Sequence, residues 1–310
     1  MASKIKEVKT KKILWLDITN ADQDNLKYLR QEFGFDPADI AECSPTLQRQ
    51  KLNDRQKYIF MVLQFPVYNR ATGSIEPSEM DMFISKKYLI INHDGQLKPL
   101  TDFFNLCQTD TLIRANIDRD ETIALLYKIL SRLYNYCYPI INHINIDIDS
   151  VEKEILNKAE EETIRNVLLV KRNITNFQKT LQAHYGILQR FTETSGGSLN
   201  CPPELQKEFF YLINQTKDIW NTLVNYKDTI NALHETQSSM TNLKINEIMK
   251  TLTIFSVIVF PLTLLAAVFG MNTVGSMPFV ESEHGFWYIL GLMVLGLGAM
   301  LLYFKKRKWI

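Results

Sequence analysis

The chain has 310 residues, of which 46% are hydrophobic and 22% charged, with 12 Gly, 10 Pro and 4 Cys. This composition is typical of a folded chain and excludes collagen, low-complexity linkers and disulfide-rich scaffolds. The formal net charge of +1 gives no overall electrostatic attraction to nucleic acid, so we expect no nucleic-acid partner. The charges are unevenly spread, because only Glu281 and Glu283 lie between Thr251 and Phe304. That stretch is predicted to be embedded in a membrane.

The N-terminal third contains short β-rich runs that alternate with polar turns. The runs are ILWLDI, KYIFMVLQFPVY, SEMDMFIS and KYLIINH, between Lys11 and about Thr101. Asn20 and Asp36 are the expected N-caps of two helices in this region. We therefore expect a small cytoplasmic α/β domain over residues 1–101. The basic N-terminus MASKIKEVKTKK has no apolar run, so we expect that it is not a secretory signal.

Long amphipathic helices are predicted after this domain, over Arg119–Lys158, over Glu161–Thr194 and from Pro203 onward. The run SGGSLNCPP at 195–203 separates the second helix from the third, with Pro203 in a first helical turn. We expect a cytoplasmic helical part over 102–202 and a stalk helix over 203–250. A helix continuous to Phe269 would be about 100 Å long. Because such a helix needs neighbours along its whole length, the pattern favours an oligomer.

Two windows of 19 residues, 251–269 and 286–304, carry no formal charge. Each would span roughly 28 Å as a helix, close to the thickness of the hydrocarbon core. The tail 305–310 begins with four basic residues, and the loop 270–285 has no Lys or Arg. By the positive-inside rule both termini are then cytoplasmic and the loop lies outside, as in a multi-pass protein of a plasma (inner) membrane. The alternative is a pair of buried helices in a soluble protein.

Cys43, Cys107, Cys137 and Cys201 are far apart and form no CxxC pair. This spacing fits a reducing compartment and disfavours a zinc-finger or redox site.

The first window carries a stripe of small, polar and flexible residues at steps of three and four. Its members are Asn242, Asn246, Met249, Thr253, Ser256, Phe260, Thr263, Ala267 and Gly270. Such a face either packs helices tightly or lines a path for water and ions. Within the window, Pro261 frees the carbonyl of Val257, which needs a partner inside a bilayer unless the proline is only a kink.

The sequence GlyMetAsn at 270–272 follows this window, and a second apolar window follows 13 residues later. Gly270 has a simple local explanation as the C′ residue that ends a helix. The match extends through NEIMKTLTIFSVIVFPLT at 246–263, MetPro at 277–278 and YFKKRKW at 303–309. With LWLD, FGFDPADI, YIFMVL and LIINHDG upstream, the chain resembles the CorA family of divalent-cation transporters along nearly its whole length.

The resemblance implies an α+β cytoplasmic domain, arranged as an α/β/α sandwich, with a long stalk helix and two C-terminal transmembrane helices. It also implies a funnel-shaped homopentamer with five first membrane helices around one axial pore. Gly270, Met271 and Asn272 would form the selectivity filter, with Asn272 holding Mg²⁺ through the waters of the ion. Mg²⁺ dehydrates reluctantly, so neutral amide oxygens can hold its waters and still release it.

The same resemblance assigns roles below and above the filter. Met249 and Leu252 match a hydrophobic gate, Glu235 an acidic ring at the cytoplasmic mouth, and Glu281 and Glu283 would attract cations in the outer loop. Glu235 is otherwise a solvated stalk carboxylate. The pore-lining positions would be Asn246, Met249, Leu252, Ser256, Phe260 and Thr263.

The chain departs from the family at two places. Phe279 follows MetPro where many relatives have Glu, and one extra residue separates Asn272 from MetPro, so cation entry is expected to be steered differently. Tyr211 stands where relatives place an Asp that senses cytoplasmic Mg²⁺ between subunits. We therefore expect regulation by bound Mg²⁺ to be weaker, displaced to other acids or absent.

No nucleotide-binding motif of the type GxxxxGK[ST] occurs, and no cofactor is expected apart from Mg²⁺ as cargo and regulatory ligand. A potential of 100 mV, negative inside, gives roughly 4.6 kcal/mol for a divalent ion, so passive influx suffices. We expect Mg²⁺ as the ion, with Co²⁺ and Ni²⁺ as further candidates.

Three alternatives stay open. One is a Zn²⁺ transporter of the same superfamily, to which His284 in the outer loop would contribute. The second is a membrane-anchored coiled-coil scaffold, in which the polar stripe only packs helices. An enzyme is the third and least favoured, because no acid/base pair or nucleophile motif is present.

Overall fold

The computed structural model describes residues 4–43, 47–119, 121–157, 161–199, 201–271, 284–307 and 309. The chain divides into two compact units, Met1–His234 and Glu235–Ile310. The first unit contains a six-stranded sheet in the order β1-β2-β6-β5-β4-β3. Only β2 and β6 pair in parallel among these strands, and all other neighbours are antiparallel. The strands are β1 (Lys4–Lys9), β2 (Leu14–Thr19), β3 (Lys51–Asp54), β4 (Ile59–Asn69), β5 (Ser74–Ile84) and β6 (Tyr88–His93).

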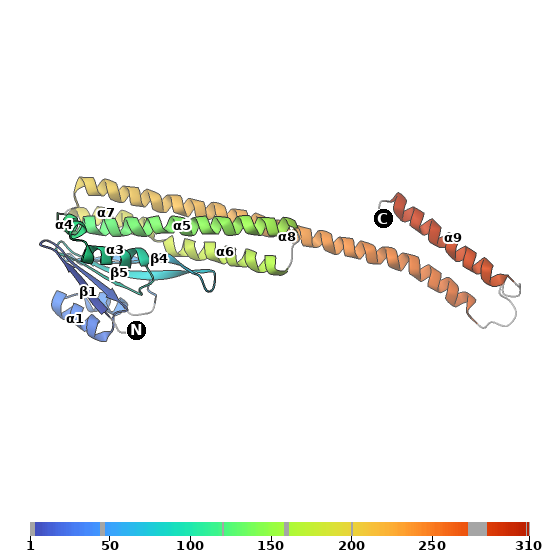
Figure 1. Cartoon of the computed structure of the whole chain (residues 1–310), viewed down its shortest axis with the longest axis horizontal. Coiled ribbons are helices and arrows are strands. Elements are labelled where there is room, and N and C mark those ends of the chain that lie inside the picture. Colours follow the sequence, from blue (N-terminus) through green and yellow to red (C-terminus); the bar gives the residue numbers. More distant parts are fainter. Residues whose placement is uncertain are drawn as a thin grey trace. The chain divides into compact units, whose positions relative to one another are not determined.

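Helices cover both faces of this sheet (Figure 1). The shorter pair, α1 (Gln23–Phe33) and α2 (Pro37–Glu42), lies on one face. The opposite face carries longer helices, and α6 packs on β4 and β5. These are α3 (Lys98–Thr109), α4 (Thr111–Arg119), α5 (Thr122–Asn157), α6 (Glu161–Leu181), α7 (His184–Ser198) and the start of α8 (Pro203–Phe269). The predicted α/β/α sandwich is confirmed.

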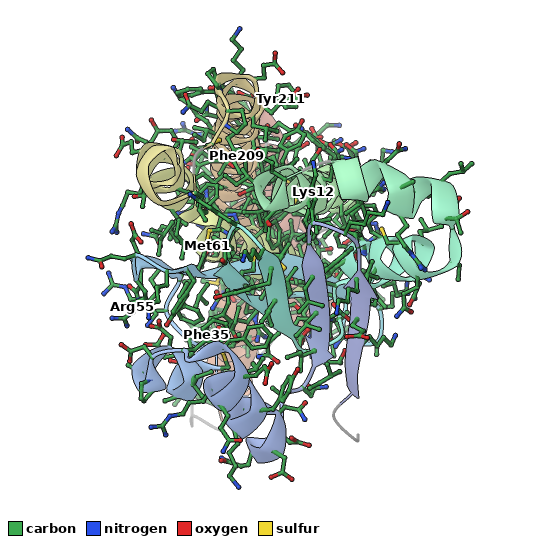
Figure 2. The ribbon with its side chains drawn as sticks, turned by 90° about the vertical axis from the view of Figure 1, so that its left-hand side faces the viewer. Lys12, Phe35, Arg55, Met61, Phe209 and Tyr211 are labelled. Carbon is green, nitrogen blue, oxygen red and sulfur yellow. The ribbon has the colours of Figure 1, made fainter. Side chains whose placement is uncertain are left out.

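Because helices pack on both faces of the sheet, the central strands have nearly continuous apolar sequences. In β4, Phe60 and Val62 face the α1 and α2 layer, where they pack with Phe35 and Phe83. On the opposite face, the ring of Phe65 lies 5.4 Å from that of Tyr134 in α5. Figure 2 shows Phe35 on the α1 side of the sheet, with Phe209 among the helices of the other side.

The caps of the first two helices correct one expectation. Asp36 caps α2, as predicted, and its carboxylate accepts from the N–H of Ala38. For α1 the cap is Asp22 and not Asn20, because the Asp22 carboxylate accepts from the N–H groups of Asp24 and Asn25. Asn20 instead takes the left-handed conformation, with φ 52°, which asparagine tolerates better than most residues.

The predicted helix over Glu161–Thr194 is in fact two helices, α6 and α7. The break carries no Gly or Pro. It lies just before His184, whose Nε2–H donates to the carbonyl of Gln64 in β4 at 2.8 Å. On its other side, the hydroxyl of Tyr134 lies 2.7 Å from the Nδ1 of His184. A tertiary contact therefore fixes this break. Helix α7 also continues to Ser198, into the run predicted as a break.

All four cysteines are buried, and none of them is part of a disulfide. The structure places α3 to α7 and the start of α8 in the same compact unit as the sheet. The predicted domain limits at residues 101, 202 and 250 stay predictions.

Candidate functional site

Two helices in the described part of the chain are long and apolar enough to cross a membrane, α8 and α9 (Gly285–Lys306). In the most apolar 18-residue stretch of α8, no residue is buried. In the corresponding stretch of α9, 6% of the residues are buried. The core helix of a soluble domain would bury such a stretch. The exposure therefore argues against the soluble alternative and for an apolar environment outside the single chain.

Helix α8 brings the predicted pore-lining positions onto one face. It runs without a break from Pro203 to Phe269 and includes Pro261. At 3.6 residues per turn, the positions from Asn246 to Thr263 lie within about 120° of the helix circumference and span about 26 Å along its axis. Leu252 and Phe260 are 56% and 71% exposed. The six positions are Asn246, Met249, Leu252, Ser256, Phe260 and Thr263, and all are exposed apart from the half-buried Ser256.

The opposite face of this segment differs in composition and exposure. It carries Ile254, Ile258, Leu262 and Leu265, all of which are half-buried. The face that holds the polar stripe is thus the more exposed one in the single chain.

The threonine hydroxyls of the stripe are oriented by the helix itself. Thr253 Oγ1 donates to the carbonyl of Met249 at 2.7 Å, and Thr263 Oγ1 donates to that of Val259 at 2.9 Å. A hydroxyl that donates its proton to its own helix keeps two lone pairs as acceptors. Such oxygens can receive hydrogen bonds from the water molecules around a hydrated cation.

Gly270 directly follows the last residue of α8, as predicted, but its conformation is not the expected one. It is not among the described glycines with positive φ, so it does not end the helix in the left-handed conformation. Its N–H donates to the carbonyl of Ala266 at 2.9 Å, and a Cβ at this position would lie 3.0 Å from that same oxygen. A side chain at this position would therefore require a small shift of the backbone. Met271 is exposed, whereas Asn272, Phe279, Glu281 and Glu283 lie outside the described residues.

The C-terminal end of α9 combines basic and aromatic groups. Lys305 and Lys306 occupy its last turn, and the Arg307 guanidinium lies 5.9 Å from the ring centre of Tyr303. The Trp309 ring stacks on Phe304 at 5.8 Å. This combination suits the interface between a bilayer and water.

The remaining predicted sites are not gathered by the structure. Glu235 is exposed, and so is Tyr211, labelled in Figure 2. Among the described residues, no three His, Cys, Asp or Glu side chains come together as a metal-ligand set. Sequence reasoning missed the buried Asp81 of β5, which lines a cavity in the α/β unit. The only signal was an aspartate inside the apolar run MDMFI.

The sequence profile of the family described as CorA-like Mg2+ transporter protein matches residues 10–306. The chain belongs to this family. It is 26% identical over 302 residues to the cobalt/magnesium transport protein CorA of Thermotoga maritima, covering 96% of this chain and 83% of that protein.

Solved structures show the same fold. The complete structure of the CorA magnesium transporter from Methanocaldococcus jannaschii has a TM-score of 0.83 at 18% identity, and the match covers 98% of this chain and 94% of that one. The cytoplasmic domain of ZntB from Vibrio parahaemolyticus has a TM-score of 0.61 at 10% identity, over 76% and 89% of the two chains. The N-terminal α/β domain, the long helix and the apolar C-terminal helix are thus shared with a full-length member of the family.

Proposed function

We propose that this chain is one subunit of a passive Mg²⁺ channel, a homopentamer in which five copies of α8 surround an axial pore. The supporting observation is the exposed stripe on α8, which runs along one face of a helix that is otherwise apolar enough to span a membrane. Membership of the CorA-like family supports transport of Mg²⁺, and the cobalt/magnesium transporter of Thermotoga maritima supports Co²⁺ as a second ion.

Hydrated Mg²⁺ is the cargo in this proposal, and the residues act on its water shell. Glu281 and Glu283 raise the local concentration of cations outside, and the amides of Gly270-Met271-Asn272 accept hydrogen bonds from the ion's waters. Farther along, Thr263, Ser256 and Asn246 offer neutral acceptors, which hold the hydrated ion without trapping it.

The gate consists of Met249 and Leu252. In the pentamer each of these residues forms a ring of five apolar side chains, and the two rings close the path by excluding water. Glu235 then provides an acidic ring where the ion leaves the pore. A membrane potential of 100 mV contributes roughly 4.6 kcal/mol per divalent ion, which is enough to drive influx. Both termini are cytoplasmic in a plasma membrane, in keeping with the basic end of α9.

The test is a flux assay on purified protein in liposomes, with uptake of Mg²⁺, Co²⁺, Ni²⁺ and Zn²⁺ measured at an imposed potential and at zero. Asn272→Ala is expected to abolish Mg²⁺ uptake while native mass spectrometry still shows five subunits. The matched control is Asn225→Ala, an exposed asparagine of α8 in the α/β unit, which keeps uptake. Normal uptake by Asn272→Ala contradicts the proposed filter and favours the scaffold alternative.

The zinc arm of the assay decides the remaining alternative. The likeness to the ZntB domain, at 10% identity, shows the fold alone. Zinc bound directly favours nitrogen and sulfur ligands, and the described residues hold no such set. We expect Mg²⁺ uptake to exceed Zn²⁺ uptake, and the reverse order would reassign the ion.

A further inference from the structure

Helix α8 has a buried row of side chains at a spacing of seven residues. Its members, all of them buried, are Thr216, Leu223, Ile230 and Gln237. Seven residues are close to two helical turns, so these positions share one side of the helix. Gln237 is the last of the row, because every described residue of α8 after it is half-buried or exposed.

The side-chain amide of Gln237 is buried without a partner. The residue is 3% exposed, and neither its Oε1 nor its Nε2 makes a hydrogen bond within the described part of the chain. By contrast, the hydroxyl of Thr216 donates to the carbonyl of Leu212 at 2.9 Å. Burying a primary amide without partners costs free energy, and a Leu or Ile at position 237 would avoid that cost.

Gln237 lies where α8 passes from one compact unit to the other. The units divide between His234 and Glu235, and α8 continues without a break beyond this point (Figure 1). Met249 of the proposed gate is 12 residues farther along the chain, or about 18 Å along the helix axis. A rigid helix carries a rotation or a tilt along its length, so the orientation of α8 at Gln237 sets that of Met249.

The amide favours a state of α8 in which this turn is open to water. A glutamine side chain has two N–H donors and one carbonyl acceptor, and water can pair with all of them. Gln237 therefore raises the free energy of the buried state relative to a hydrated one. A position that breaks the pattern of its neighbours at a cost in stability is typical of a site with a function.

We propose that Gln237 is a positioning residue of the gate. It lowers the cost of exposing this turn of α8 to water, and that movement turns Met249 and Leu252 away from the pore axis. The inference rests on the proposed function, because Gln237 acts through the gate. An apolar residue at 237 would strengthen the fold and, by the same change, hold the gate shut. A merely structural role would give the gain in stability without the loss of flux.

The test is Mg²⁺ uptake by the full-length protein in liposomes, combined with hydrogen–deuterium exchange of the peptide over 230–245. Gln237→Met keeps the length of the side chain and removes the amide. It is expected to lower uptake about tenfold and to slow exchange in this peptide. Gln237→Asn keeps a primary amide and is expected to retain uptake within about twofold of the parent protein.

The matched control is Gln206→Met, at a half-buried glutamine of α8 in the α/β unit. The amide of Gln206 has a partner, the carbonyl of Cys201 at 3.5 Å. We expect this change to alter neither the uptake nor the exchange of the 230–245 peptide. Gln237→Leu provides a second apolar variant in case Gln237→Met fails to assemble.

Two outcomes would overturn the proposal: parental exchange in a folded apolar variant at 237, or slower exchange with parental uptake. The proposed filter fails separately from this role. Normal uptake by Asn272→Ala contradicts the filter. Loss of uptake in Asn272→Ala together with parental uptake in Gln237→Met contradicts only the role of Gln237.

Discussion

The two units of the chain solve the burial of apolar residues in opposite ways. In the α/β unit, β4 is buried on both faces, and Phe60, Met61 and Leu63 are 0% exposed. In the second unit, Leu252 and Phe260 of α8 are 56% and 71% exposed. The first unit completes its core within one chain. The second leaves apolar surface uncovered in the single chain, which a bilayer can cover.

The largest expected effect is the loss of stability on truncating Phe60 in the α/β unit, compared with the same change at Phe260 in the second unit. Phe60→Ala should lower the free energy of unfolding of the α/β unit by about 3–5 kcal/mol, because it leaves a cavity between the sheet and the α1 layer. Phe260→Ala should leave that unfolding transition unchanged. Urea unfolding followed by tryptophan fluorescence measures both. Equal losses in the two variants would contradict the contrast between the units.

A buried charge network gives the next effect. Asp39 is 0% exposed and accepts hydrogen bonds from Arg55 at 2.7 and 2.9 Å and from Tyr58 at 2.8 Å. Burial raises the pKa of Asp39, but the bonds from Arg55, Tyr58 and Asn53 outweigh it, so the pKa is lowered overall. The carboxylate therefore stabilises the fold above about pH 4, and this contribution disappears as the pH falls through its lowered pKa.

Asp39→Asn removes the charge and should cost about 2 kcal/mol at pH 7, the scale of charge-assisted hydrogen bonds. Asp24→Asn changes an exposed carboxylate in α1 and should alter stability by less than about 0.5 kcal/mol. Unfolding at pH 7 and pH 3 compares them. If Asp39→Asn is as stable as the parent protein at pH 7, the network does not stabilise the fold.

The sequence predicts the central strands of the sheet well and misses the edges. The runs around β2, β4, β5 and β6 are long and apolar, because both faces of the sheet are covered. The two missed strands, β1 (KIKEVK) and β3 (KLND), are the outer strands of the sheet. Lysines and short length protect an edge strand from pairing with other chains, and they also remove the apolar pattern.

The pore-lining face of α8 can be predicted from the helical repeat of the sequence, whereas features that depend on contacts between distant residues cannot. A continuous helix puts Asn246 and Thr263 on one face by its period alone. The break before His184 depends on Gln64, which is 120 residues away, and Asp81 acquires its surroundings from β6 and Cys43. No local signal carries such contacts. The roles of Asn272, Glu281 and Glu283 stay predictions.

The proposed gate gives a smaller effect, measured as flux. Leu252→Asn should raise resting Mg²⁺ uptake about tenfold, because a polar ring lowers the cost of wetting the constriction by about 1.4 kcal/mol. The matched control is Leu265→Asn, which places the same amide on the opposite, half-buried face of α8. An equal rise in both variants, measured in liposomes, would remove the gate from Leu252.

The smallest expected effect is a pH dependence of the α/β unit. Burial lowers the pKa of His184 to about 3, so the folded protein keeps this histidine neutral at pH 6, where the unfolded chain begins to protonate it. A lowered histidine pKa therefore destabilises the fold as the pH falls below about 6.5. Between pH 7.5 and 6.0 the loss should be about 0.8 kcal/mol. His184→Gln should lack this part of the slope, and His143→Gln, which changes a more exposed histidine, should retain it. The difference between each variant and the parent cancels the other titrating groups. Equal slopes in all three proteins would contradict a lowered pKa of His184 in the fold.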